Sequence, residues 1–375
     1  MSKTLLMIGV GDLAGLVLNL LVQGKEFGKI ILAGRDLAEM NRRKNLALLF
    51  SAQLGRYHRI ECVQMDLQNV EQSAHWIRDL KPDVIFNTAT LQSWRIITQL
   101  PTAAFKALDE AQFGPWLPMH LSLMHKLMKA VDLSGQKPFV VNAAFPDAVG
   151  PVLKSVGMAP QIGIGNVANV LPALRGALGL MLEVPLQEVH VSLYTQHYLS
   201  HRVPAAGDSG GAPYVARARI NGHDVTGEVD FEDAFGLVQT KFQRTGGAFR
   251  QLITASSAVS VLSPVLLEQT ATVHAPAPGG LPGGYRVRLV GGEAVVDVPD
   301  GMALDTLIQV NNDCQRFDGI DRIEADGTVV FTEREMQVMH RLLGYECLRM
   351  PLSEVDARAE ELGAKYREFF AKATA

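Results

Sequence analysis

The chain has 375 residues, of which 47% are hydrophobic and 20% are charged, and its formal net charge is −4. This composition excludes a disordered chain and is typical of a globular protein long enough for two domains. Because there is no basic surplus and no block of Lys and Arg, we expect neither nucleic acid nor a membrane as a partner.

Short apolar runs alternate with helical patterns in the first half of the chain. Residues 4–10, 29–33, 59–64, 83–87 and 139–142 have the length and composition of buried strands. Helices are predicted over residues 13–22, 36–54, 70–80 and 116–131. Apolar strands separated by helices are typical of a parallel sheet covered on both faces. The pattern predicts an α/β fold, with a doubly wound parallel Rossmann sheet in a dinucleotide-binding domain over residues 1–150.

The pattern changes after residue 150, where we expect an α+β substrate and oligomerisation domain over residues 151–375. Residues 163–181 predict a helix, and residues 188–198 alternate apolar and polar side chains as a strand with two different faces does. Residues 205–213 are expected to form a mobile loop. The Pro/Gly-rich residues 274–284 are expected to form a linker.

A glycine motif between the first strand and the first helix points to a cofactor. Gly9-Val10-Gly11-Asp12-Leu13-Ala14 fits the pattern G-x-G-x-x-A. Gly9 permits the tight turn, Gly11 lets the backbone approach a pyrophosphate, and Ala14 keeps helix and strand close. The helix amino terminus offers unpaired N–H groups to phosphates. We therefore expect Gly9, Gly11, Asp12, Leu13 and Ala14 to bind the dinucleotide, with the Asp12 carboxylate pointing outward as a helix cap.

The end of the second strand bears on the choice of dinucleotide. Domains that prefer NAD usually place an acid at this tip, whereas here Gly34 stands there and Arg35 follows. A guanidinium suits a 2′-phosphate, so we expect NADP in preference to NAD. Asp36 is the alternative ligand for the ribose.

Three further residues complete the expected cofactor site. Asp66, just past the third strand, either accepts from the adenine amino group or caps the helix over residues 70–80. Thr88 and Ala89 directly follow the fourth strand.

The segments 139–153, 163–169 and 188–197 resemble, distantly, the lactate/malate dehydrogenase superfamily. That family has an Asn-Pro-x-Asp segment after a strand, then a Gly-rich turn leading to a catalytic Asp and a substrate Arg, then a strand ending in a catalytic His. Order and spacing agree over roughly residues 1–205. The Ala33–Asp36 segment and Asp66 also resemble saccharopine-dehydrogenase-like cofactor domains. The resemblance implies an NAD(P)-dependent oxidoreductase acting on a small molecule.

The resemblance assigns roles to five residues. His197 matches the histidine that exchanges a proton with the substrate carbonyl. Asn169 falls where the family has the aspartate that orients this histidine, and would hold the ring by an amide hydrogen bond. Arg95 would polarise the carbonyl, Arg175 would bind an anionic end of the substrate, and Asn142 would hydrogen-bond substrate. Because Asn169 departs from the family pattern, the expected substrate is a carbonyl or imine compound rather than simply a 2-hydroxy acid.

Two other functions remain open from the sequence. One is a non-catalytic sensor or scaffold that binds the dinucleotide. The other is a dinucleotide-dependent glycosidase-like enzyme, which would need a divalent metal.

The cysteines and the amino-terminal segment indicate the cellular location to expect. Cys62, Cys314 and Cys347 are far apart, so they predict neither a disulfide framework nor a metal site. The apolar start contains Gly9, Gly11 and Asp12, which is a poor export signal. We expect a cytoplasmic protein without a membrane span, and a homodimer because closed twofold dimers dominate among oligomers.

Overall fold

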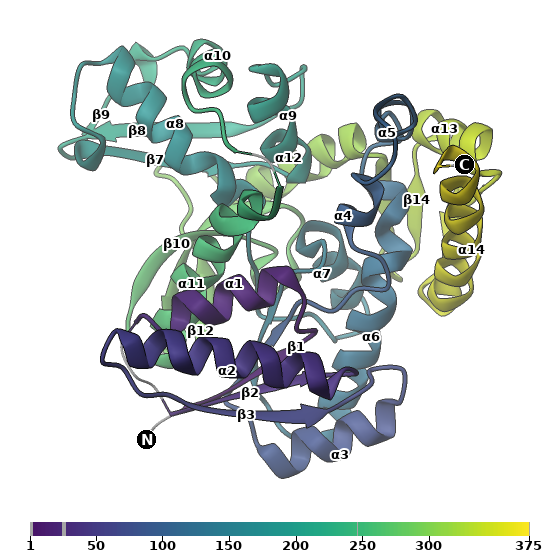
Figure 1. Ribbon diagram of the computed structural model, residues 1–375. Coiled ribbons are helices and arrows are strands. Elements are labelled where there is room, and N and C mark those ends of the chain that lie inside the picture. Colours follow the sequence, from purple (N-terminus) through teal and green to yellow (C-terminus); the bar gives the residue numbers. More distant parts are fainter. Residues whose placement is uncertain (1–2, 25–27, 246, 375) are drawn as a thin grey trace.

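The computed structural model describes residues 3–24, 28–245 and 247–374, and the side chains of residues 94, 95, 247 and 248 lie outside the description. Its centre is a six-stranded parallel sheet in the order β3-β2-β1-β4-β5-β6 (Figure 1). The strands are β1 (Thr4–Ile8), β2 (Lys29–Gly34), β3 (Arg59–Gln64), β4 (Val84–Asn87), β5 (Phe139–Asn142) and β6 (Ile162–Gly163). The strand order reverses direction between β1 and β4, and ligands of such sheets bind in the crevice at the carboxyl ends of these strands.

Helices connect consecutive strands and cover both faces of the sheet. They are α1 (Asp12–Leu21), α2 (Leu37–Gln53), α3 (Val70–Leu80), α4 (Trp94–Ile97), α5 (Thr102–Asp109), α6 (Leu117–Ser134) and α7 (Pro146–Lys154). Local sequence sets several of their ends: the Asp36 and Asn69 side chains cap α2 and α3, and Gly135 in a left-handed conformation ends α6. The predicted doubly wound Rossmann sheet is therefore confirmed.

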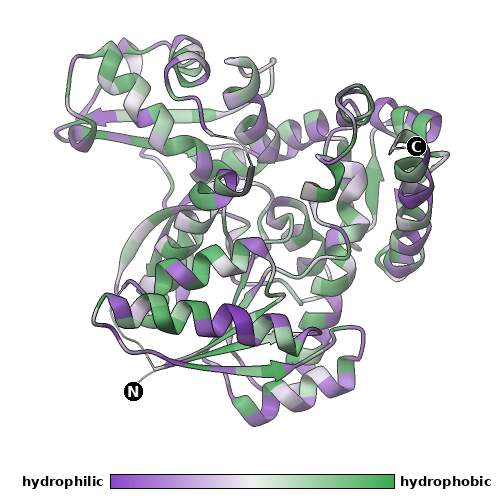
Figure 2. Cartoon of the chain, viewed as in Figure 1, coloured by the Kyte–Doolittle hydropathy of each residue, from purple (hydrophilic) through white to green (hydrophobic). Residues whose placement is uncertain are grey.

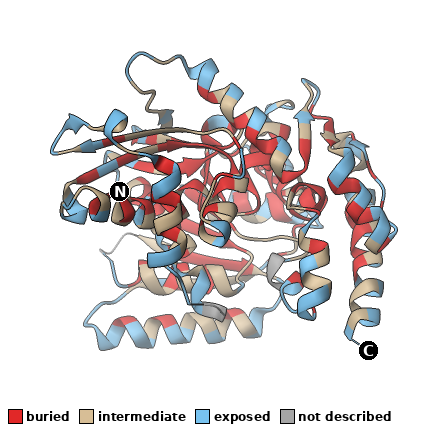
Figure 3. Ribbon diagram, turned by 90° about the horizontal axis from the view of Figure 1, so that it is seen from above, coloured by how far each residue is buried: buried red, intermediate tan, exposed pale blue. Residues whose placement is uncertain are grey.

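Side chains of the sheet alternate between two hydrophobic cores. Leu6 and Ile8 of β1 join the core that includes α3, α6 and α7. Leu5 and Met7 join the core that includes α1, α2 and α11 (Leu252–Leu266). Strands β1, β2, β4 and β5 between these cores are hydrophobic (Figure 2) and largely buried (Figure 3), whereas the edge strand β3 is only partly buried. Two-sided burial explains why these strands read as continuous apolar runs.

A second lobe stands above the carboxyl ends of the sheet in the view of Figure 1. It contains α8 (Val167–Met181), β7 (Val189–Tyr194), α9 (His197–Ala206), β8 (Val215–Ile220), β9 (His223–Asp224) and α10 (Phe231–Lys241). Strands β7, β8 and β9 form an antiparallel sheet, and the helices share a hydrophobic core with it. A third sheet, also antiparallel, consists of β10 (Ala271–Pro276), β11 (Gly284–Val290) and β12 (Glu293–Val296).

The last part of the chain returns to the first part. It contains α12 (Leu304–Gln315), β13 (Ile320–Ile323), β14 (Val329–Phe331), α13 (Glu333–Leu343), β15 (Arg349–Met350) and α14 (Val355–Thr374). The Tyr366 hydroxyl on α14 donates to the carbonyl of Ile96 at 3.1 Å, and its ring packs edge-on against Trp116 at 5.5 Å. The predicted α+β architecture after the Rossmann sheet is confirmed. The boundary at residue 150 stays a prediction; residue 150 lies within α7, and β6 follows it.

Three local predictions were wrong. The predicted linker over 274–284 is shorter, because residues 274–276 belong to β10, which pairs with β11 along its whole length, and Gly284 begins β11. The strand predicted over 188–198 ends at Tyr194, and His197 begins α9, where the Gln196 side chain accepts from the Tyr198 N–H as the helix cap. The loop predicted to start at residue 205 starts after this helix. Within the described residues, no helix combines the length and apolar composition needed to cross a membrane.

Candidate active site

A cavity of about 1370 Å³ opens at the carboxyl ends of β1, β2 and β4. Its walls include nearly all of the residues expected to bind the cofactor: Gly9, Gly11, Asp12, Leu13, Gly34, Arg35, Asp36, Asp66, Thr88 and Ala89. Ala14 is buried behind them in the core under α1. The residues that the sequence predicted for the cofactor site therefore form one contiguous surface, at the point where the strand order reverses.

The two glycines of the turn have different surroundings: the backbone of a neighbouring loop lies close to Gly9, whereas the space in front of Gly11 is open. Gly9 has a φ of +83°, and a Cβ there would stand 2.5 Å from the backbone nitrogen of Ala89. Gly11 begins α1 without any side-chain cap, and a Cβ there would meet nothing within 4 Å. Gly9 is thus required by the fold, whereas Gly11 leaves room in front of the free N–H groups of α1.

Asp12 does not cap α1, so that expectation was wrong. Its carboxylate instead accepts from Nη2 of Arg43 at 3.3 Å, and Nη1 of Arg43 donates to the carbonyl of Gly11 at 3.1 Å. The Arg43 Nε also pairs with Glu39 at 2.9 Å. A positive charge from α2 therefore offsets the acid beside the glycine turn.

Arg35 is exposed at the rim of the cavity, and the described residues give its side chain no hydrogen bond or ion pair. Asp36 is occupied, since its Oδ1 accepts from the Glu39 N–H at 2.9 Å to cap α2. Asp66 does not cap α3, because the Asn69 side chain performs that role. Oδ1 of Asp66 accepts instead from the Gln68 N–H at 3.0 Å.

Thr88 and Ala89 hold the other side of the glycine turn. The Thr88 hydroxyl donates to the carbonyl of Gly9, and the Ala89 N–H donates to Oδ1 of Asn87 at 3.1 Å. These bonds fix the loop after β4 against the loop after β1.

His197 lines the same cavity and has a buried carboxylate as its partner. Its Nδ1 lies 2.9 Å from Oδ2 of Asp318, and the two side chains are 18% and 2% exposed. The other carboxylate oxygen accepts from the Phe113 N–H at 3.4 Å. The rings of Phe113 and Phe145 lie 4.8 and 5.5 Å from the His197 ring. With Nδ1 bound to Asp318, Nε2 is the ring nitrogen available for proton exchange.

Charges around His197 oppose the effect of its burial. Burial lowers the pKa of His197, but the carboxylates of Asp318 and Asp147 outweigh it and leave the pKa above its ordinary value. Asp147 lies at the start of α7, fully buried, and its Oδ2 accepts from the Asn166 amide. Burial raises the pKa of Asp147 to about 6, although His197 acts in the opposite direction. The two carboxylates therefore stabilise the protonated form of His197.

His120 is a second imidazole on the cavity wall, with different properties. Burial lowers its pKa to about 3, so the ring is neutral. Its Nδ1 lies 3.2 Å from the Thr90 hydroxyl. The His120 ring can therefore form a hydrogen bond with a ligand as a neutral imidazole, without a positive charge.

Two of the five residues assigned by the resemblance, Asn169 and Arg175, have other partners in the structure, and a third cannot be placed. The Asn169 amide donates to the Thr254 hydroxyl at 3.1 Å, so the prediction that Asn169 orients His197 was wrong. Arg175 donates to the carbonyls of Val189 and Leu186 at 2.7 and 3.0 Å, and it lines a different cavity. The side chain of Arg95 lies outside the described residues.

Asn142 is fully buried and supports a turn. Its Oδ1 accepts from the Asn87 amide at 3.1 Å and from the Ala144 N–H at 3.0 Å, and its Nδ2 donates to the carbonyl of Ala144. These bonds use its polar atoms inside the protein rather than toward the cavity.

Sequence reasoning missed Asp318, Asp147 and Asn166 as members of the site. Asp147 lies in the segment 139–153 that resembles the Asn-Pro-x-Asp segment of the dehydrogenases, and this resemblance could have identified it as a site residue. Asp318 follows His197 by 121 residues with no motif around it. In the described part of the chain, no group of three or more His, Cys, Asp or Glu side chains is arranged to hold a metal ion.

Comparisons with known proteins address the fold. No protein-family model matches the sequence, and no curated protein matches it. Malate dehydrogenase from Plasmodium falciparum superimposes with a TM-score of 0.56 at 14% identity, covering 97% of this chain and 99% of that one. Malate dehydrogenase from Cryptosporidium parvum gives 0.56 at 16%, covering 85% and 98%. Lactate dehydrogenase from Eimeria maxima, with NADH and oxamate, gives 0.54 at 14%, covering 83% and 91%. The chain has the fold of these dehydrogenases.

Proposed function

We propose that the protein is an NAD(P)-dependent oxidoreductase acting on a small carbonyl or imine compound, with His197 as the proton donor and acceptor. The observation that carries the proposal is the His197–Asp318 pair on the wall of a cavity bounded by the glycine turn. The solved structures with this fold include enzymes bound to NADH, which supports the same chemistry.

The residues at the glycine turn fit a dinucleotide. The space in front of Gly11 and the uncapped amino terminus of α1 suit a pyrophosphate, which would accept from the free N–H groups. The cavity of about 1370 Å³ extends from this turn past Thr88 to His197. A nicotinamide dinucleotide bound there would supply or accept the hydride.

His197 handles the proton. In reduction, Nε2 gives its proton to the substrate oxygen or nitrogen, and in oxidation it takes the proton back. Asp318 fixes the ring orientation through Nδ1 and stabilises the imidazolium, and the Asp147 charge adds to this effect. Phe113 and Phe145 pack beside the ring and keep water away from it.

NADP is the proposed preference. Arg35 is exposed without a partner among the described residues, whereas Arg42 and Arg43 are paired with Glu39. Gly34 at the end of β2 leaves no acid at the tip of the strand. The free guanidinium is therefore the group that would bind a 2′-phosphate.

The substrate end of the proposal rests on fewer residues. Arg175 lies in another cavity, so Arg95 is the remaining candidate to bind an anionic or polarised substrate group. A homodimer and a cytoplasmic location belong to the proposal as well, on the grounds of symmetry statistics and thiol usage.

Fluorescence titration with NADPH and NADH tests the cofactor. We expect NADPH to bind at least about tenfold more tightly, and Arg35→Ala to lose this preference, because a charge-assisted bond to the 2′-phosphate is removed. Arg42→Ala is the matched control and should retain the preference. The absence of binding by either dinucleotide would overturn the proposal.

A panel of carbonyl and imine compounds then tests the reaction through the absorbance of the reduced cofactor. His197→Gln should lose at least about a hundredfold in turnover with unchanged dinucleotide affinity. Tight dinucleotide binding without turnover on any member of the panel would instead favour a sensor.

A further inference from the structure

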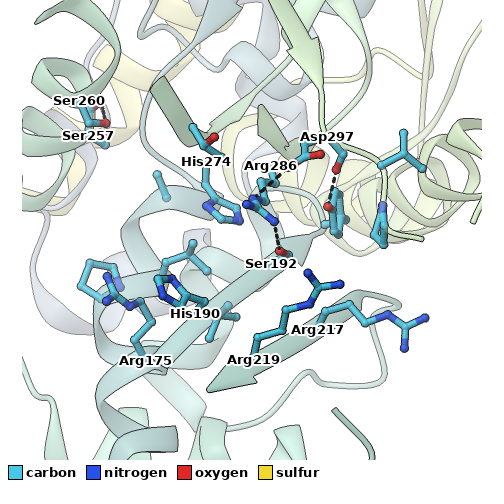
Figure 4. Close-up of a pocket in the computed structure, with 18 of the residues that line it drawn as sticks. Arg175, His190, Ser192, Arg217, Arg219, Ser257, Ser260, His274, Arg286 and Asp297 are labelled. Atoms are coloured by element: carbon cyan, nitrogen blue, oxygen red, sulfur yellow. Dashed lines mark hydrogen bonds and ion pairs between the residues drawn. The ribbon is translucent and has the colours of Figure 1, made fainter. Parts of the chain in front are cut away.

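A second cavity, of about 940 Å³, lies away from the proposed cofactor cleft, and the two share no lining residue among those described. It is bounded by α8, α11 and strands β7, β8 and β11 (Figure 4). We call it the arginine pocket after four side chains on its walls: Arg175 from α8, Arg217 and Arg219 from β8, and Arg286 from β11.

The acids around the arginine pocket compensate only part of this charge. Arg286 pairs with Asp297 at 3.2 Å. Arg219 reaches Asp300 at 3.4 Å, but that carboxylate is 97% exposed, so solvent weakens the pair. The remaining acid on the wall, Asp224, accepts from the Thr226 N–H at 2.9 Å.

Two guanidinium groups have no carboxylate partner within the described chain. Arg175 is fixed by two backbone carbonyls, which orient it without neutralising it. Among the described residues, the Arg217 side chain forms neither a hydrogen bond nor an ion pair, although its charge helps to lower the pKa of Asp224 on the same wall after the bonds from Thr226. One fixed and one free cation therefore face the same cavity.

Neutral donors and acceptors complete the pocket. Burial, together with the nearby charges of Arg286 and Arg175, lowers the pKa of His274 to about 3, so this ring is neutral. The Ser192 hydroxyl accepts from Nη1 of Arg286 at 3.4 Å, whereas the Ser257 and Ser260 hydroxyls on the α11 wall donate to backbone carbonyls of α11. Figure 4 shows His274, Arg286 and Ser192 close together on one side of the cavity.

We propose that the arginine pocket binds a small, multiply charged oxyanion, of the polyphosphate or polycarboxylate class. Guanidinium groups match the paired oxygens of phosphates and carboxylates, and arginines on separate elements can contact different groups of one ligand. The volume lies in the range of small-molecule sites. This inference does not rest on the proposed oxidoreductase activity.

Isothermal titration calorimetry with inorganic triphosphate and, separately, with citrate tests the pocket. We expect one of them to bind at one site per chain, and Arg217→Gln to weaken that binding at least about tenfold. Since the Arg217 side chain makes no hydrogen bond to the described residues and the substitution leaves the backbone pairing with β7 in place, this variant should retain the fold. Whichever anion binds more tightly assigns the ligand to the phosphate or the carboxylate class.

Two control variants locate the binding. Arg288→Gln removes an exposed arginine of β11 that does not line the pocket, and Arg35→Ala removes the free arginine of the cofactor cleft. Both should leave the affinity within about twofold. Binding of neither anion, an equal loss in Arg217→Gln and Arg288→Gln, or a loss confined to Arg35→Ala would each overturn the proposal.

Discussion

The partnership between His197 and Asp318 predicts how the histidine titrates. Asp318→Asn keeps the shape of the side chain and removes its charge. Burial lowers the pKa of His197, and the Asp318 charge is one of the effects that raise it again. In the variant, less negative charge opposes the effect of burial. The pKa of His197 should therefore fall.

The geometry sets the size of the effect. The Nδ1–Oδ2 distance of 2.9 Å is that of a direct charge-assisted bond. Two unit charges about 4 Å apart interact by about 4 kcal/mol at an effective dielectric constant of about 20. Asp147 remains and retains part of the potential. We expect the pKa of His197 to fall and turnover to drop by about 10²- to 10⁴-fold at neutral pH.

NMR titration of the histidine Cε1 resonances measures the pKa without any substrate, with His197→Gln used to assign the signal. The matched control is Asp321→Asn, which removes a nearby carboxylate that pairs with Arg316 and Arg322 instead. In the reductive direction the protonated histidine is required, so the alkaline limb of the pH–rate profile should move to lower pH in Asp318→Asn. A His197 pKa equal in the wild type and in Asp318→Asn would refute the reasoning.

Two further predictions concern the glycine turn and the buried acid. Gly9→Ala should lower the midpoint of thermal unfolding, since its Cβ would meet the Ala89 backbone, whereas Gly11→Ala should retain that midpoint and lose dinucleotide affinity in the fluorescence titration. Equal stability of the two variants would contradict this. For Asp147, the folded-state pKa of about 6 exceeds the ordinary 3.8, so ionisation costs stability as pH rises between these values, by about 3 kcal/mol in total. Asp147→Asn should remove this cost. The free energy of unfolding of the variant, measured with urea, should therefore increase relative to that of the wild type from pH 4 to pH 7. A difference in unfolding free energy that does not change with pH would contradict this prediction.

The half of the candidate site around the glycine turn could be predicted from the sequence because its residues obey local rules. Gly9 and Gly11 are needed where a strand turns into a helix, and the carboxyl ends of parallel strands bring Arg35, Asp66 and Thr88 to one edge. Neighbours along the chain, or at equivalent ends of adjacent strands, are neighbours in space. These positions are fixed by periodicity and turns alone.

The half of the candidate site around His197 depends on contacts that no local pattern encodes. His197 was identified, but its partner was placed on Asn169, which lies close in sequence and packs instead against Thr254 on α11. Asp318 reaches His197 only because the segment after α12 folds back against Phe113 and Gly114. Such tertiary packing is visible in three dimensions and not in residue spacing.

The late position of Asp318 sets an order of events during synthesis. The six strands of the central sheet are complete at Gly163, whereas the carboxylate for His197 arrives far later in the chain. At ordinary rates of translation the interval is on the order of ten seconds or more. A nascent chain thus completes the sheet that bounds the proposed dinucleotide crevice well before Asp318, the direct hydrogen-bond partner of His197, is synthesised.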